Sequence, residues 1–234
     1  MKILAIDSSG LVASVAVIED NRMLAEYSIN YKKTHSQTLV PMLDEIKKMI
    51  DLELNSLDAI AVAKGPGSFT GLRIGSATAK GLGLALNIPI IPVPTVDALS
   101  FNVWGFSGYI CPLMDARRNQ VYTGIYHFEN GVHCVDVEQC AISIDELILK
   151  INKLDKSVIF LGDGVDVYAD VIASKVAVGY QFAPAHLSVQ HAGSLGTLAK
   201  ELFERGVVES AAEHQPDYLR LSQAERERLE KMKC

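Results

Sequence analysis

The order of strand-like and helix-like segments repeats in the two halves of the chain, and this repeat constrains the fold more than any other feature. The first half begins "ILAIDSSGLVASVAVI" and the second "ICPLMDARRNQVYTGIY". Each gives an apolar run, an aspartate, a tight turn and a second strand-like run. With Asp7 and Asp115 taken as equivalent, few residues are identical, so the inference rests on the order of elements. We therefore predict a duplicated α/β fold with a cleft between two lobes.

Apolar runs predict the strands, and apolar stripes with steps of three and four residues predict the helices. Predicted strands cover residues 3–6, 12–18, 22–29, 58–63 and 88–93 in the first half, and 109–114, 121–128, 132–141, 158–161 and 176–182 in the second. Predicted helices cover residues 36–50, 69–86, 143–152, 166–174 and 192–205, with another beginning near Thr95. This pattern places the first lobe at residues 1–104, the smaller second lobe at 105–206 and a tail at 207–234. The tail either packs back on the first lobe or keeps a charged face in solvent.

Composition narrows the function classes. Hydrophobic residues make up 49% of the 234 positions and charged residues 21%, as in a folded globular chain. No stretch approaches the roughly 18 uninterrupted apolar residues that span a bilayer, so we expect a cytoplasmic protein. The net charge is −6, whereas proteins that grip nucleic acid by themselves usually carry a basic face. Any RNA should therefore be held mainly by a partner.

Cysteine and histidine spacing gives no metal motif. The cysteines are Cys111, Cys134, Cys140 and Cys234, and no two form a C-x-x-C pair. The histidines are His35, His127, His133, His186, His191 and His214, with no H-E-x-x-H. No G-x-S-x-G elbow is present. We predict neither a metal site nor a triad hydrolase.

A glycine-rich loop, "GPGSFTG", follows the predicted strand at 58–63 and opens the next helix. Backbone N–H groups at such a helix start can hold an anion, and Gly67, Ser68 and Thr70 are the candidate residues. The loop is not a Walker A motif, because Leu72 and Arg73 stand where lysine and serine or threonine should follow. The alternative is a plain turn with Ser68 or Thr70 as the helix cap.

Small residues recur every four positions on that helix. Gly71, Gly75, Ala79 and Gly83 share one face, and Gly81 adds another glycine. An interior glycine costs about 1 kcal/mol relative to alanine, so this helix needs a compensating close approach. The face packs either against the chain's own sheet or against another subunit.

Two aspartates mark the predicted cleft. Asp7, followed by Ser8, and Asp115 stand at strand-to-turn junctions, where open α/β sheets bind ligands. These residues are candidates for a vestigial nucleotide cleft. The alternative is that each aspartate caps its own turn.

Five stretches together closely resemble the TsaB (YeaZ) family: "KGPGSFTGLRIG", "ILAID", "THSQTLVPMLDEI", "MDARRNQVY" and "QPDYLRL". The resemblance implies the actin-like, sugar-kinase-like (ASKHA) fold, with two mixed-sheet lobes. It implies a non-catalytic platform that binds the paralogue TsaD, works with the ATPase TsaE and forms a homodimer when alone. The complex transfers threonylcarbamoyl to the adenosine next to the anticodon of tRNAs that read codons starting with A. ATP and a metal are then expected on the partner subunits, and tRNA contacts this subunit only indirectly.

The resemblance also implies which residues matter. TsaD-like proteins carry a metal-binding H-x-x-x-H after the strand that follows the glycine helix, and Thr95 and Leu99 stand there in this chain. Threonine is a poor substitute ligand and leucine is none, so we expect no metal. The family's interface maps onto Leu39, Leu43 and Ile46 of the first helix and Gly71, Leu72, Gly75, Ala79 and Gly83 of the second. The alternative function is a stand-alone ATP-binding transferase or hydrolase that uses the cleft of Asp7 and Asp115.

Overall fold

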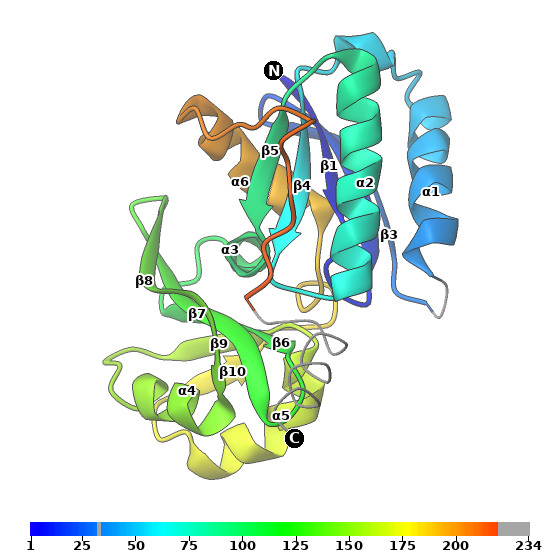
Figure 1. Cartoon of the computed structure of the whole chain (residues 1–234). Helices are drawn as coiled ribbons and strands as arrows, with labels where there is room; N and C mark the ends of the chain where they lie inside the picture. The colour runs from blue at the N-terminus through cyan, green and yellow to red at the C-terminus, as the bar shows by residue number, and fades with distance from the viewer. Residues whose placement is uncertain (32–33, 220–234) are drawn as a thin grey trace, which may run out of the picture.

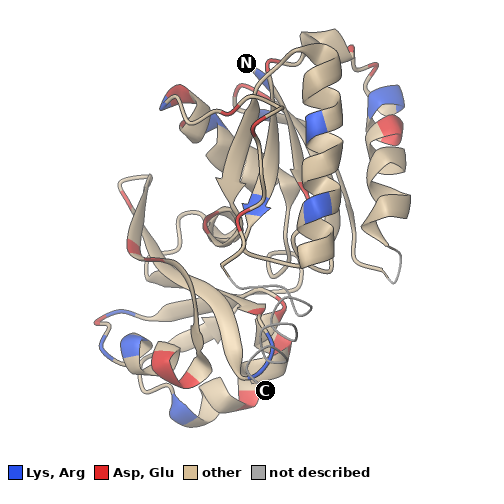
Figure 2. Cartoon of the chain, in the orientation of Figure 1, with Lys and Arg blue, Asp and Glu red and all other residues tan. Residues whose placement is uncertain are grey.

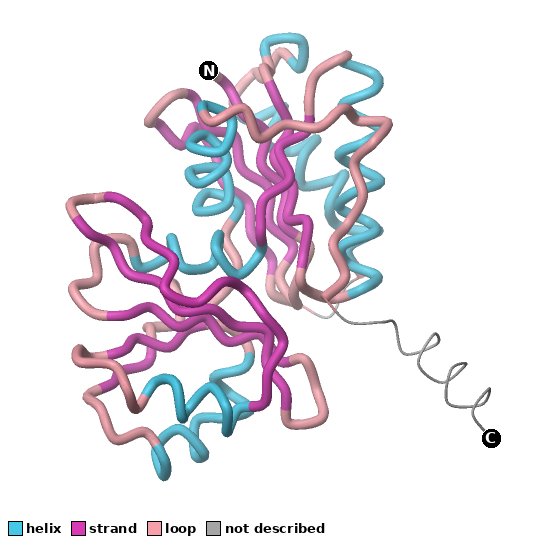
Figure 3. The backbone as a smooth tube through the Cα atoms, turned by 60° about the vertical axis from the view of Figure 1, so that its left-hand side comes forward, coloured by secondary structure: helices cyan, strands magenta, loops and turns pink. Residues whose placement is uncertain are grey.

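The computed structural model describes residues 1–31 and 34–219, so Arg220 and Cys234 lie outside the described residues. Two lobes, each built on a five-stranded mixed sheet, lie one above the other (Figure 1). Figure 3 shows the two sheets from the side, with helices on both faces of the upper one.

The two sheets share one topology. The first sheet has the order β3-β2-β1-β4-β5, formed by β1 (Lys2–Asp7), β2 (Ala13–Glu19), β3 (Arg22–Ile29), β4 (Ala59–Gly65) and β5 (Ile90–Pro94). The second has the order β8-β7-β6-β9-β10, formed by β6 (Tyr109–Asp115), β7 (Gln120–Glu129), β8 (Val132–Ser143), β9 (Val158–Leu161) and β10 (Tyr180–Phe182). In each, the first strand pairs antiparallel with the next and parallel with the fourth. The predicted duplication is confirmed strand for strand.

Helices pack against the faces of both sheets. They are α1 (His35–Met49), α2 (Phe69–Leu86), α3 (Thr95–Ser100), α4 (Ile144–Ile151), α5 (Gly164–Lys175) and α6 (Ala192–Glu204), with 3-10 turns at Leu54–Ser56 and Phe101–Val103. Helices α1 and α2 share a core with Leu4 and Ile6 of the first sheet, and α4 and α5 cover the second sheet in the same way. The predicted bounds of α2 are confirmed, because Ser68 caps its start and Asn87 ends it in a left-handed conformation with φ of 54°.

The last helix of each repeat contacts the sheet of the other lobe, and α3 also contacts its own sheet through Ala98. Val96 and Leu99 of α3 share a core with Ile110 and Met114 of the second sheet. Helix α6 instead packs on the first sheet, where alanines such as Ala5 let it approach closely. The division predicted at residue 206 does not match this packing, because α6 belongs with the first lobe.

The described part of the tail, residues 207–219, also lies on the first lobe. Glu209 pairs with Ile90 at the edge of the first sheet, and the N–H of Asp217 donates to the carbonyl of Lys64 at 2.6 Å. Figure 1 shows this segment, in orange and red, running down in front of β5 beside α2. The segment "SQAERERLEKMKC" lies wholly beyond residue 219, so its predicted packing or solvation stays a prediction.

One predicted strand is shorter than expected. The prediction over residues 176–182 holds only for Tyr180–Phe182. Helix α5 continues to Lys175, and the N–H of Val176 still donates to the carbonyl of Ile172. A short run of valines is compatible both with a strand and with the end of a helix. The pattern therefore predicted a longer strand than the chain forms.

Candidate functional site

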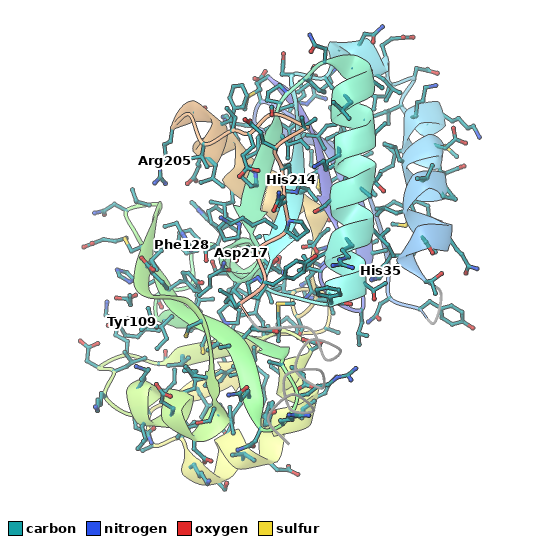
Figure 4. The ribbon with its side chains drawn as sticks, viewed as in Figure 1. His35, Tyr109, Phe128, Arg205, His214 and Asp217 are labelled. Atoms are coloured by element: carbon teal, nitrogen blue, oxygen red, sulfur yellow. The ribbon has the colours of Figure 1, made fainter. Side chains whose placement is uncertain are left out.

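A cavity of about 690 Å³ lies between the two lobes and is lined by residues of both. Its walls come from the turn after β1, the start of α2, the end of β6, the start of α5 and the tail. Figure 4 shows Asp217 on the tail segment, close to the level at which the lobes meet. The strand ends that the sequence analysis singled out therefore do surround a cleft.

Asp7 does not face this cavity. Its side chain is 2% exposed, and one carboxylate oxygen accepts the N–H of Ser9 at 2.8 Å and the Ser9 hydroxyl at 2.6 Å. Burial raises the pKa of Asp7, and the two hydrogen bonds from Ser9 oppose that rise. The buried Ser8 hydroxyl donates to the carbonyl of Gly71 at 2.9 Å. Asp7 therefore caps its own turn, as the local alternative predicted, and Ser8 holds that turn against α2.

Asp115 does line the cavity, and it lies beside a second carboxylate. Asp115 accepts the N–H of Arg117 at 2.8 Å, and its own N–H donates to Asp163 at 3.3 Å. Burial raises the pKa of Asp163 to about 6, and the negative charge of Asp115 acts in the same direction. Sequence reasoning missed Asp163. Its signal was the run Gly162-Asp163-Gly164 directly after the predicted strand at 158–161.

The cavity is acidic. Carboxylates of Asp115, Asp163, Asp166 and Asp217 line it, whereas Arg117 is the one cationic side chain that the described residues contribute to its wall. A polyphosphate would be repelled unless a cation accompanied it. Asp166 and Asp217 had not been predicted either, because each is brought to the cavity by a fold contact rather than by a motif.

The loop before α2 is held by hydrogen bonds to the first turn of α2 and to the turn after β1. The Ser68 hydroxyl accepts the N–H of Gly71 at 3.3 Å, and the N–H of Ser68 donates to the carbonyl of Ser9 at 2.7 Å. Gly67 leaves no room for a Cβ beside the Ser9 carbonyl. These contacts favour the turn with a capped helix. Anion binding at Gly67, Ser68 and Thr70 stays a prediction.

The glycine face of α2 packs inside the chain, so the predicted interface residues need correction. A Cβ on Gly71 or Gly75 would collide with Ser8, and one on Gly83 would lie 2.9 Å from the Cβ of Ala211. The same holds for the apolar stripe of α1, which is buried against the first sheet. The buried set is Leu39, Leu43, Ile46, Gly71, Leu72, Gly75, Ala79 and Gly83. A partner cannot contact these side chains while the lobe is folded, so they do not form a subunit seam.

A serine, a histidine and a glutamate meet beneath the tail. The Ser76 hydroxyl lies 3.0 Å from Nε2 of His214, and Nδ1 of His214 lies 3.0 Å from Glu209. The order resembles a nucleophile, base and acid, yet Ser76 is 3% exposed and His214 1%. None of the three lines the interlobe cavity. Lys80 also donates to the carbonyls of Ala212 and His214, so this cluster fastens the tail to α2 (Figure 4).

Thr95 and Leu99 lie one turn apart on the short helix α3, which Thr95 begins. Both are buried, and Leu99 belongs to the apolar core between α3 and the second sheet. The Thr95 hydroxyl has no hydrogen-bond partner among the described residues. A hydroxyl and a methyl-bearing side chain supply no imidazole nitrogen at this place.

Membrane insertion finds no support in the described helices, since none combines the length and apolarity needed to cross a bilayer.

Comparisons with known proteins agree with this geometry. A family model described as TsaD, tRNA N6-adenosine threonylcarbamoyltransferase, matches residues 22–228. The tRNA threonylcarbamoyladenosine biosynthesis protein TsaB of Bacillus subtilis is 35% identical over 235 residues, covering 100% of both chains. The protein of that name from Escherichia coli is 27% identical and covers 94% of this chain and 95% of its own. The crystal structure of YeaZ from Pseudomonas aeruginosa superposes with a TM-score of 0.77 at 25% identity, covering 93% of this chain and 99% of that one.

Proposed function

Since the chain belongs to the TsaB (YeaZ) family, with a role in the biosynthesis of threonylcarbamoyladenosine in tRNA, we propose that it acts as a non-catalytic platform. It binds a TsaD paralogue, which carries out threonylcarbamoyl transfer with the ATPase TsaE. ATP and the metal reside on those partners, and tRNA meets this subunit only indirectly. Alone, the chain forms a homodimer through the same surface.

Gly81 is the observation that carries this proposal. Gly71, Gly75 and Gly83 are explained by close contacts inside the lobe, but a Cβ on Gly81 would meet nothing within 4 Å. An exposed interior glycine weakens a helix by about 1 kcal/mol relative to alanine. No contact among the described residues offsets that loss. In this proposal a helix of another subunit packs closely against Gly81 and offsets the loss.

The surface around Gly81 suits a partner helix. Ala77 and Ala85 are exposed one turn to either side of Gly81, and Leu84 is 63% exposed. Figure 2 shows two basic bands, Arg73 and Lys80, and no acidic residue on α2. At the start of the helix, exposed Leu11 and Tyr31 line a hollow of about 600 Å³. Small and apolar side chains without carboxylates favour close helix packing by a neutral or acidic partner face.

The non-catalytic role is supported by the two places where chemistry would sit. Thr95 and Leu99 provide no pair of metal ligands. The carboxylate of Asp7 accepts hydrogen bonds from Ser9 in its own turn. The cavity between the lobes repels an unaccompanied polyphosphate through its four carboxylates.

Size-exclusion chromatography with light scattering tests the platform. The wild-type chain should form a complex with its cognate TsaD paralogue, and Gly81→Leu should weaken that complex at least tenfold. Ala173→Leu is the matched control, because Ala173 is an exposed small residue on α5 in the other lobe. Equal binding by wild type and Gly81→Leu would remove α2 from the interface. No complex with wild type and a folded paralogue would refute the platform.

A stand-alone nucleotide enzyme is the second candidate. Asp115 and Asp163 favour it, because both line the interlobe cavity and carboxylates can hold a hard cation with a nucleotide. Calorimetric titration of the isolated chain with ATP and Mg²⁺ separates the two functions. Binding that is lost in Asp115→Asn would support the enzyme, whereas no heat at millimolar nucleotide would support the platform.

A further inference from the structure

The β7–β8 hairpin carries a cluster of potential metal ligands that the proposed function does not use. His127, Glu129 and Cys134 each offer a ligand atom, and these atoms all lie within 4.8 Å of one another. His127 and Cys134 are paired directly across the two strands. Glu129 is two residues beyond His127 and shares its face of the hairpin. No other such group of three occurs among the residues that the structure describes.

The opposite face of the hairpin is packed, so the cluster side is the one turned outward. Phe128 lies edge-on to Phe101 with ring centroids 5.5 Å apart, and His133 stacks on Tyr126 at 5.1 Å. Figure 4 shows Phe128 on the side of the hairpin nearer the first lobe. The alternation of a strand therefore puts apolar rings on one face and the ligand groups on the other.

A fourth residue fixes the histidine ring. Nδ1 of His127 lies 2.6 Å from a carboxylate oxygen of Asp136. A proton on Nδ1, donated to that carboxylate, leaves the lone pair on Nε2. Metal-binding histidines in proteins almost always have such a carboxylate or carbonyl partner on the other ring nitrogen.

The donor set defines the class of ion. Thiolate and imidazole together favour Zn²⁺ over Mg²⁺ or Ca²⁺, which prefer oxygen ligands. An ion at the centre of the three atoms would lie at most about 2.8 Å from each, and zinc bonds to nitrogen and sulfur are about 2.0–2.3 Å. A closure of roughly 0.5–0.8 Å is within reach of side-chain rotation, since Glu129 is exposed and the others are partly exposed.

We propose that the β7–β8 hairpin binds one zinc ion through His127, Glu129 and Cys134, with Asp136 positioning His127 and one coordination position open to solvent. This departs from the sequence expectation of no metal site. The ligands come from two strands, so their spacing in sequence matches no helical or C-x-x-C motif. The site lies in the second sheet, whereas α1 and α2 pack on the first sheet. It is therefore independent of the platform proposal.

The test is zinc titration of the untagged full-length chain in competition with a chromophoric chelator. Wild type should bind one equivalent. Cys134→Ser, His127→Ala and Glu129→Gln should each weaken binding at least tenfold, and Asp136→Asn by roughly 10–100-fold. Cys140→Ser, Cys234→Ser and His186→Ala are matched controls that should bind as wild type, and far-UV circular dichroism checks that every variant is folded.

Cobalt gives a readout specific to the sulfur. Co²⁺ bound by the wild-type chain should show a thiolate-to-metal charge-transfer band that disappears in Cys134→Ser and survives in Cys140→Ser. Failure of the wild-type chain to bind zinc would overturn the proposal. Binding that is retained by folded His127→Ala and Cys134→Ser, or lost in Cys234→Ser, would also overturn it.

Discussion

Gly75 of α2 lies directly against the Ser8 hydroxyl, with no room for a Cβ between them. Ser8 in turn donates its hydrogen bond to Gly71, one turn earlier on the same helix. The helix is therefore locked to the turn after β1 by the absence of side chains on its inner face.

Gly75→Leu should destabilise the lobe rather than act selectively on partner binding. The leucine would displace Ser8 and the end of β1, and overpacking of this kind costs roughly 1–3 kcal/mol or more. Chemical denaturation should show a lower midpoint for Gly75→Leu than for Gly81→Leu, which places the same side chain on the exposed face. A variant with wild-type stability and no partner binding would restore the inner glycine face as the interface.

At concentrations at which the chain is monomeric, Gly81→Ala should stabilise it by about 1 kcal/mol, because the position is exposed in the monomer and an alanine lowers the conformational entropy of the unfolded chain. The same change should not strengthen the complex with the paralogue, because the added methyl group lies on the proposed contact surface. Thermal unfolding of the free chain measures the first effect. An unchanged or lower melting temperature of the monomer would mean that Gly81 has a stabilising contact within its own chain.

Ser76→Ala should loosen the tail. Removing the hydroxyl leaves Nε2 of buried His214 without its 3.0 Å partner, and an unsatisfied buried polar group costs about 1–3 kcal/mol. Hydrogen exchange should become faster across residues 207–219 while the second lobe keeps its protection. Ser174→Ala, on an exposed position of α5, is the control. Unchanged exchange in the tail would mean that Lys80 and the pairing of Glu209 with Ile90 suffice to hold it.

Mild acid should destabilise the contact between hairpin and α3 through His133. Burial lowers the pKa of His133 to about 4, while the unfolded chain keeps a value near 6.5. Ser100 donates its hydroxyl proton to the carbonyl of Asp97, so Nε2 of His133 is the donor to Ser100 at 2.8 Å. As the pH falls from about 6.5 to 4, His133 becomes protonated in the unfolded state but stays neutral in the folded state. The free energy of unfolding therefore falls.

The measurement for His133 is denaturant unfolding at a series of pH values for wild type and His133→Gln. The slope between pH 6.5 and 4 should be shallower in the variant. A histidine with the opposite shift provides a contrast, because the hydrogen bond that His191 donates to Glu26 raises the pKa of His191. The contribution of His191 is complete below pH 6.5 and is lost as the pH rises through its raised folded value. Identical slopes in wild type and His133→Gln would contradict the assignment.

Local signals were sufficient wherever one segment decides its own structure. Ser68 and Ser143 each accept an N–H in the first turn of the following helix, so caps and apolar periodicity placed α2 and α4 within a residue. Continuous apolar runs located the central strands because both faces of those strands are buried. The order of these elements was enough to predict the duplicated lobes and the cleft that Asp115 lines.

The tertiary structure alone decided what each predicted surface contacts. A four-residue period puts Gly71, Gly75 and Gly83 on one face, but not whether Ser8 or another subunit meets it. The meeting of Ser76 with His214 spans 138 positions, and the cluster around His127 depends on the register of a hairpin. The packing of α6 on the first sheet depends on the alanines of that face, such as Ala5, whereas α3 contacts both sheets. Periodicity is a property of one segment, whereas contact, burial and exposure belong to pairs of segments. The sequence therefore determined the elements and their order, and the packing of those elements decided which of their faces remain free to bind.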